Sequence, residues 1–189
     1  MSTLFVNNLN TASGSTITIP TGKQLIGTDS GTFKQPGMIL QTVASNSDTR
    51  FASSSTSWVD TGLFSLTFPN NLQSGSKVLA RIHVTIGEVN NNNWSNRVSL
   101  SIFENTTNKG SDDYGMVNGN AQHQGTTWTV YEVNRLTGEE MFTPSVLNGT
   151  YKLYFKSNSG FERVVGMSSN TGTHNPTGKT QVILQEIAQ

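Results

Sequence analysis

The stretch that decides the fold is Val78-Leu79-Ala80-Arg81-Ile82-His83-Val84-Thr85-Ile86. Its even-numbered positions are all apolar, while Arg81, His83 and Thr85 occupy the alternate positions. Successive side chains of a β-strand point to opposite faces, so this period of two predicts a strand with one buried face. The length and regularity of the pattern predict that this strand lies at the centre of a sheet.

Shorter alternating segments lie on both sides of this strand, separated by connections rich in Asn, Gly and Ser. Val98, Leu100 and Ile102 form a partner face. Six to eight strands without a long helical pattern predict an all-β, antiparallel sandwich of the jelly-roll type. The other predicted strands are Met38–Val43, Phe64–Phe68 (ended by Pro69), Thr127–Val133, Tyr151–Phe155 and Val182–Ile187.

One local exception to this pattern is Thr137-Gly138-Glu139-Glu140, which has the spacing of a helix capping box. It predicts a single helical turn at most. The two adjacent carboxylates face no candidate nucleophile, and a solvated turn explains them better than an acid/base pair does.

Residues 1–36 differ from the rest of the chain, since their short apolar segments cannot bury a core on their own. Ordering each residue costs about 1–2 kcal/mol of backbone entropy, more than a few aliphatic side chains return. Either the segment is disordered or several copies of the chain share its apolar side chains, and the regular spacing favours sharing. The sequence therefore predicts an extended oligomerisation or anchoring segment at 1–36 and a head at 37–189. The anchoring side chains would be Leu4, Val6, Ile17, Ile19, Leu25 and Ile26.

Three N-terminal motifs carry a resemblance to a known class of proteins. They are Ser2–Asn8, Ile19–Asp29 and Gln35–Gln41, and two C-terminal strands, Gly149–Phe155 and Thr180–Ile187, accompany them. Together they resemble short tail-fibre and virion appendage proteins of marine cyanophages and related phages. The resemblance implies a trimeric phage structural protein with a β-rich head, and it leaves the position on the virion open.

Composition excludes several other classes of protein. Of the 189 residues 13% are charged, the formal net charge is +0, and the sequence has no Cys. A nucleic-acid partner is not expected without a basic surface, and disulfides and thiolate metal sites are impossible. No apolar run approaches the ~20 residues of a membrane-spanning helix, and no secretory signal is recognisable. We therefore expect synthesis in the bacterial cytoplasm and a final location on the exterior of the virion, with no membrane partner.

Motifs for catalysis are weak, and we expect no enzyme and no cofactor. Gly172–Thr180 imitates a phosphate-binding loop, but its first glycine is misplaced by one residue and a strand follows instead of a helix. A polysaccharide depolymerase would need paired carboxylates, for which Asp112 or Asp113 with Glu162 are the only candidates.

Three connections are candidate binding loops: residues 87–96, 105–126 and 157–177. Aromatic rings beside amides and carboxylates suit sugar recognition, because a pyranose offers an apolar face and a rim of hydroxyls. Packing against a neighbouring subunit explains the same aromatic residues equally well. The candidate ligand-binding residues are Asn92, Trp94, Asp112, Asp113, Tyr114, His123, Arg163 and His174.

Metal binding has two weak candidates, and we expect no metal. Three copies of one histidine around a trimer axis could hold an ion. Asp112 and Asp113 could offer backbone carbonyls to calcium, although the spaced oxygen ligands of a calcium loop are missing.

The sequence and its resemblance therefore predict a homotrimeric tail fibre that binds other virion proteins through its N-terminal segment and a host surface glycan through its head. The alternative is a capsid decoration or tail-capping protein with no receptor role.

Overall fold

The structure is a computed structural model of the chain and describes residues 21, 36–88, 97–120, 133–158, 163–166 and 179–189. The chain divides into two compact units, Met1–Phe33 and Lys34–Gln189. The anchoring side chains predicted between Leu4 and Ile26 lie outside the described residues, as do the stalk and the greater part of the unit that contains them. The fold given below is that of the second unit.

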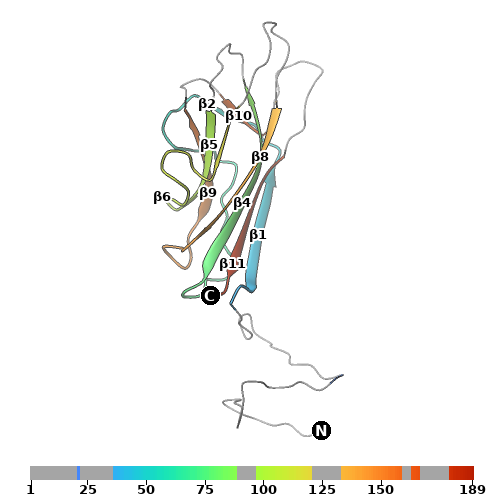
Figure 1. Cartoon of the computed structure of the whole chain (residues 1–189), viewed down its shortest axis with the longest axis vertical. Coiled ribbons are helices and arrows are strands. Elements are labelled where there is room, and N and C mark those ends of the chain that lie inside the picture. Colours follow the sequence, from blue (N-terminus) through green and yellow to red (C-terminus); the bar gives the residue numbers. More distant parts are fainter. Residues whose placement is uncertain (1–20, 22–35, 89–96, 121–132, 159–162, 167–178) are drawn as a thin grey trace. The chain divides into compact units, whose positions relative to one another are not determined.

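The described part of the second unit is all-β and contains no helix (Figure 1). Its strands are β1 (Ile39–Ser47), β2 (Phe51–Ser53), β3 (Val59–Asp60), β4 (Lys77–Glu88), β5 (Arg97–Glu104), β6 (Thr107–Asn108), β7 (Val117–Asn120), β8 (Val133–Phe142), β9 (Tyr151–Ser157), β10 (Arg163–Val165) and β11 (Thr180–Ile187). They form two antiparallel sheets, one in the order β1-β11-β4-β10-β2 with β8 also paired to β4, and the other in the order β3-β9-β5-β6 with β7 also paired to β5. The predicted antiparallel sandwich is confirmed.

Strand β4 is central, as its alternation predicts. It pairs with β8 along Val78–Gly87, and on its other edge it pairs first with β11 and then with β10. Val78, Ala80, Ile82 and Ile86 are fully buried, and Ile82 belongs to the same apolar cluster as Leu100 and Phe155 of the opposite sheet. Burying an aliphatic side chain of this size stabilises the fold by about 1.5–3 kcal/mol, so this face holds the two sheets together.

Strand β5 lies in the second sheet, so its apolar residues meet β4 across the core and do not pair with it. Val98, Leu100 and Ile102 are buried, and the backbone of β5 pairs with β9. Period-two patterning identifies a buried face but carries no information about which strand is its hydrogen-bonded neighbour.

Two local predictions are wrong. Phe64 and Leu66 are buried as expected, but the segment forms only one bridge, Leu66 to Tyr151, in place of a strand. Its buried side chains fill the core, but only Leu66 exchanges backbone hydrogen bonds with Tyr151, and Pro69 has no N–H to extend a ladder.

The helical turn predicted at Thr137–Glu140 is instead part of β8. Ten residues of β8 pair continuously with β4, and this ladder outweighs a local capping signal. Gly138 also permits close packing of β7, since a Cβ there would lie 2.3 Å from Val117 Cγ2. Residues 127–132 of the strand predicted at Thr127–Val133 lie outside the described residues, and Val133 begins β8.

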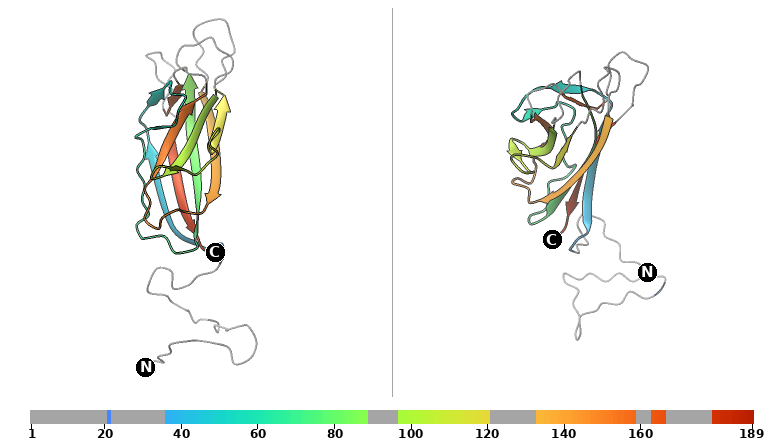
Figure 2. Two further views of the ribbon diagram at one scale, coloured as in Figure 1. Left: turned by 90° about the vertical axis from the view of Figure 1, so that its left-hand side faces the viewer. Right: turned by 45° about the horizontal axis from the view of Figure 1, so that its top comes forward.

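The sandwich has a proximal end, where β1 begins and β11 ends, and a distal end opposite to it (Figures 1 and 2). At the proximal end, defined by Met38, Lys77, Phe142 and Ile187, the chain enters β1 and leaves β11. Gly37 N–H donates to the carbonyl of Ala188 at 2.9 Å, and Ala188 N–H donates to the carbonyl of Met38 at 2.9 Å. The two ends of the head's backbone are therefore hydrogen-bonded to each other.

The distal end is defined by Glu88, Arg97, Asn120, Val133 and Ser157. Register groups these residues within each sheet, because Gly87 pairs with Val133 in the first sheet, and Arg97 with Asn120 and Val98 with Ser157 in the second.

A buried carboxylate, Glu104, ties together the segments at the proximal end. It is 1% exposed and accepts hydrogen bonds from Lys109 Nζ at 2.7 Å, Ser145 N–H at 2.7 Å and the Tyr151 hydroxyl at 3.2 Å. Burial alone would raise the pKa of Glu104. The hydrogen bonds from Lys109 and Ser145, together with the positive charge of Lys109, instead lower that pKa below its ordinary value. Burial and the charge of Glu104 raise the pKa of the Tyr151 hydroxyl.

Candidate functional site

The candidate site begins with β5 and β9 at the distal end of the second sheet. These two strands pair side by side, with Ser99 opposite Lys156 and Val98 opposite Ser157. Just beyond β9, Asn158 N–H donates to the carbonyl of Arg97 at 3.1 Å, and its side-chain amide donates to Ser99 Oγ at 3.4 Å. The backbone around Arg97, Lys156 and Asn158 is therefore held by the sheet.

A tight turn at Ser111–Gly115 brings Asp112, Asp113 and Tyr114 to the same place. Gly115 N–H donates to the carbonyl of Ser111 at 2.9 Å, and Tyr114 N–H donates to Ser111 Oγ at 3.0 Å. Gly115 has φ +65°, and a Cβ there would lie 2.4 Å from the carbonyl oxygen of Leu100. Only glycine combines this left-handed conformation with so close an approach to β5.

A row of aromatic side chains supports the turn. Trp58 Nε1–H donates to the carbonyl of Asp112 at 3.0 Å, and the Trp58 ring lies 5.7 Å from the ring of Phe103. Phe103 in turn stacks on Tyr154, with ring centroids 3.9 Å apart. The Trp58 and Phe103 rings are tilted by 58°, an arrangement that is favourable beyond the area it buries, so the row makes a stiff base for the turn.

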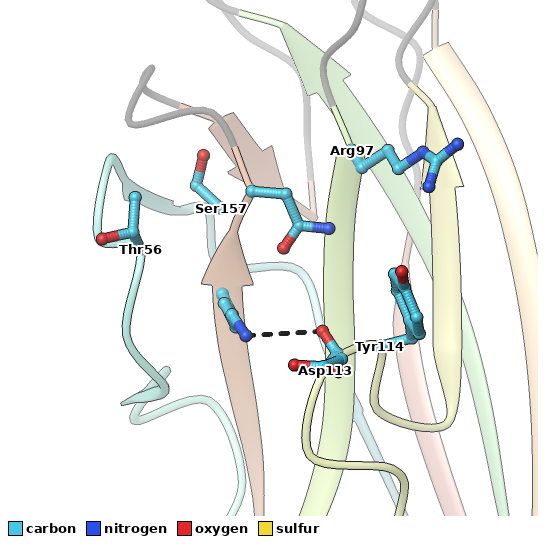
Figure 3. A pocket seen from close by; sticks show the side chains of 7 residues that line it. Thr56, Arg97, Asp113, Tyr114 and Ser157 are labelled. Atoms are coloured by element: carbon cyan, nitrogen blue, oxygen red, sulfur yellow. Dashed lines mark hydrogen bonds between the residues drawn. The ribbon is translucent and has the colours of Figure 1, made fainter.

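Lys156 connects the aromatic row to the turn. Its ammonium lies 5.8 Å from the centre of the Trp58 ring and donates to the backbone carbonyl of Asp113 at 3.4 Å, the bond drawn in Figure 3. A cation over the face of Trp is attracted by the ring quadrupole. These two contacts fix the ammonium next to the turn while leaving it further N–H groups to donate.

Together these elements surround an open hollow of about 510 Å³ (Figure 3). Arg97 and Asp113 are exposed, and the Tyr114 side chain is 52% exposed, the highest value among the large apolar and aromatic side chains that the structure describes. Two cations and one carboxylate give the hollow a formal charge of +1. Its lining residues are Thr56, Arg97, Asp113, Tyr114, Lys156, Ser157 and Asn158.

The structure brings Asp113 and Tyr114 of the predicted binding set to one hollow, with Asp112 in the same turn. The backbone of Arg163 lies in β10, in the other sheet, where it pairs with Glu88 and Ser53. The predicted residues Asn92, Trp94, His123 and His174, and Glu162 of the carboxylate-pair hypothesis, lie outside the described residues.

Sequence reasoning missed Arg97, Lys156, Asn158 and Thr56. Lys156 carried a usable signal, because it alternates with the apolar residues of β9 and so must face away from the core. Arg97 and Thr56 carried none, since their place depends on strand pairing and on the path of the chain between β2 and β3.

The calcium hypothesis for Asp112 and Asp113 is not supported by the turn. Both backbone carbonyls that would serve as ligands already accept hydrogen bonds, from Trp58 and from the Lys156 ammonium. Within the described ranges no three His, Asp or Glu side chains are grouped as a metal ion would require.

A second hollow, of about 450 Å³, lies on the outer face of the first sheet. There His83 Nδ1 lies 3.2 Å from Thr137 Oγ1, and the neighbouring Arg81 pairs with Glu139 at 3.1 Å. Arg135 and Lys179 complete its charged rim. This surface has no exposed aromatic ring among its lining residues, and we regard the first hollow as the better candidate for a sugar site.

Comparison with known proteins does not assign the chain to a family. No protein-family model matches the chain, and no curated protein matches its sequence. The described residues form no helix long and apolar enough to cross a membrane.

Proposed function

We propose that this chain is a phage virion structural protein, a homotrimeric tail fibre whose head binds a glycan on the host cell surface. The observation that carries the proposal is that the point where the chain enters the sandwich and the candidate site lie at opposite ends of it. The chain enters the head at the proximal end, next to residues 37 and 38, whereas the hollow with Tyr114 lies at the distal end. A fibre needs this separation, because one end must attach to the particle while the other reaches the cell.

The strand order supports a jelly-roll head. When β2, β6 and β10 are set aside, the remaining eight strands pair in the order β1-β11-β4-β8 in one sheet and β3-β9-β5-β7 in the other. Jelly rolls have eight strands in two such sheets and recur among viral and lectin domains.

Trimer formation would let weak sites act together. Three sites on one trimer, and several trimers on one particle, raise the effective concentration at the cell surface without any single tight site. The exposed Tyr114 ring and its polar neighbours suit such a site, since stacking on a sugar face needs little buried area.

The first experiment measures the mass of the full-length protein by light scattering, and then its binding to host cells and its competition with the parent phage. A trimer that binds and competes supports the fibre. Tyr114→Ala is expected to lower binding and leave the mass unchanged. A trimer that ignores cells would refute the receptor role, and loss of the trimer in Tyr114→Ala would place this ring at a subunit interface.

One observation favours the alternative, a capsid decoration or tail-capping protein. Met38, Ile39 and Met141 are each more than 40% exposed at the proximal end, where an apolar surface could contact a neighbouring virion protein. Under this alternative, particles would retain the protein, removal of residues 1–36 would detach it, and neither form would bind cells.

A further inference from the structure

The charge of the first hollow, which contains Tyr114 and is called the distal hollow below, indicates the kind of sugar that it accepts. Arg97 and Lys156 both line it, and among the described residues neither side chain forms an ion pair with a carboxylate. This distinguishes them from Lys109 and Lys152, which pair with Glu104 and Asp60 at 2.7 and 2.8 Å. The hollow therefore offers two cations that a ligand can pair with.

The N–H donors of these two cations suit an anion that accepts several hydrogen bonds. An Arg guanidinium has five N–H donors in a planar fork that matches a carboxylate, and a Lys ammonium has three. Lys156 uses one donor on the carbonyl of Asp113 and is steadied by the Trp58 ring. A donor held in place before binding loses less entropy when the ligand arrives.

The remaining lining groups suit the rest of a sugar ring. Tyr114 presents an exposed ring for the apolar face of a pyranose, and the Asp113 carboxylate and Asn158 amide can hydrogen-bond hydroxyls. A volume of about 510 Å³ lies within the range of small-ligand sites and admits one or two sugar residues.

We propose that this hollow binds a carboxylate-bearing sugar residue of a surface polysaccharide. Lys156, beside the Asp113 turn, takes the carboxylate, Arg97 supplies further donors to the same sugar from across the hollow, and Tyr114 packs against the ring. The formal charge of +1 balances one carboxylate, whereas a phosphate monoester with a charge of about −1.5 to −2 would leave a surplus next to Asp113. The inference rests on the proposed glycan-binding function and names its substrate class.

The test uses the full-length protein on an array of matched pairs, each pair an acidic oligosaccharide containing a uronic acid and its carboxyl-reduced counterpart. We expect binding to acidic members only, and a loss of about tenfold or more in Arg97→Gln and in Lys156→Gln. Lys179→Gln is the matched control, because it removes the same charge from an exposed side chain outside the hollow and is expected to bind as the parent does.

Equal binding to the reduced members, no binding to any member, or equal binding by Arg97→Gln and Lys179→Gln would overturn the inference. Cell binding by the same preparation separates this failure from that of the proposed function. A protein that binds cells and neutral sugars keeps the receptor role and loses the acidic specificity. A protein that binds acidic members through Arg97 but ignores cells keeps the site and loses the adsorption role.

Discussion

Replacing Glu104 by Gln tests whether the buried ion pair at the proximal end holds the head together. The parent carboxylate is 1% exposed and accepts hydrogen bonds from Lys109, Ser145 and Tyr151, while the Lys109 side chain is only 7% exposed. The amide preserves the shape but removes the charge, so the Lys109 ammonium stays buried without a counter-ion. Breaking a buried pair in this way costs about 3–5 kcal/mol.

The assay is urea unfolding of the full-length protein, followed by tryptophan fluorescence, with the free energy obtained by linear extrapolation. Glu139→Gln is the matched control, because it removes the same charge from an exposed pair with Arg81 and is expected to cost less than about 1 kcal/mol. Adding Lys109→Met to Glu104→Gln is expected to restore about 1 kcal/mol or more, since the unpaired charge is then gone. A loss in Glu104→Gln no larger than that of Glu139→Gln would refute the reasoning.

The same pair predicts a pH dependence. The pKa of Glu104 is lower in the folded state than the ordinary value of 4.5, so below that value the unfolded state takes up its proton first. The stability that the carboxylate contributes is therefore complete above about pH 5.5 and declines as the pH falls through 4.5 towards the folded pKa. The difference in unfolding free energy between the parent and Glu104→Gln is expected to shrink over that window and to stay constant above it. A difference that grows on acidification would contradict this assignment.

Two further changes test the turn that carries Asp113 and Tyr114. Gly115→Ala is expected to destabilise the head by about 1–3 kcal/mol and to weaken sugar binding, because a Cβ at φ +65° would meet the Leu100 carbonyl and the Trp58 ring. An unchanged melting temperature of this variant would show that the turn is not packed as described. Trp58→Phe removes the hydrogen bond to the Asp112 carbonyl and is expected to lower the free energy of unfolding in urea by about 1 kcal/mol and to weaken binding to the acidic sugars of the array. Full sugar binding by this variant would show that Trp58 does not position the turn.

The fold class could be predicted from the sequence because one segment is unambiguous. The alternation from Val78 to Ile86 specifies a strand with one buried face, and the structure confirms that strand at the centre of a sheet. Tyr151–Phe155 and Val182–Ile187 carry the same signal and are also strands. In each case one face of the strand meets the core, so local pattern and tertiary environment agree.

The failures have a different physical origin. The pairing of β8 with β4 decides the conformation of Thr137–Glu140, and that partner is more than fifty residues away in the sequence. Asp113 and Tyr114 could be predicted as candidate binding residues from their chemistry, but Arg97 and Lys156 join them only through the pairing of β5 with β9 and the turn closed at Gly115. Long-range register of this kind leaves no trace in local composition.

The backbone hydrogen bonds between residues 37–38 and Ala188 have an evolutionary consequence. A domain whose first and last residues are neighbours can be spliced into another chain as a cassette, since the recipient needs to open by only a few ångströms at the junction. Any sequence joined after Gln189 would start next to Gly37 and away from the Tyr114 hollow. Recombination could thus exchange this whole domain between otherwise unrelated chains without rebuilding the rest of either chain.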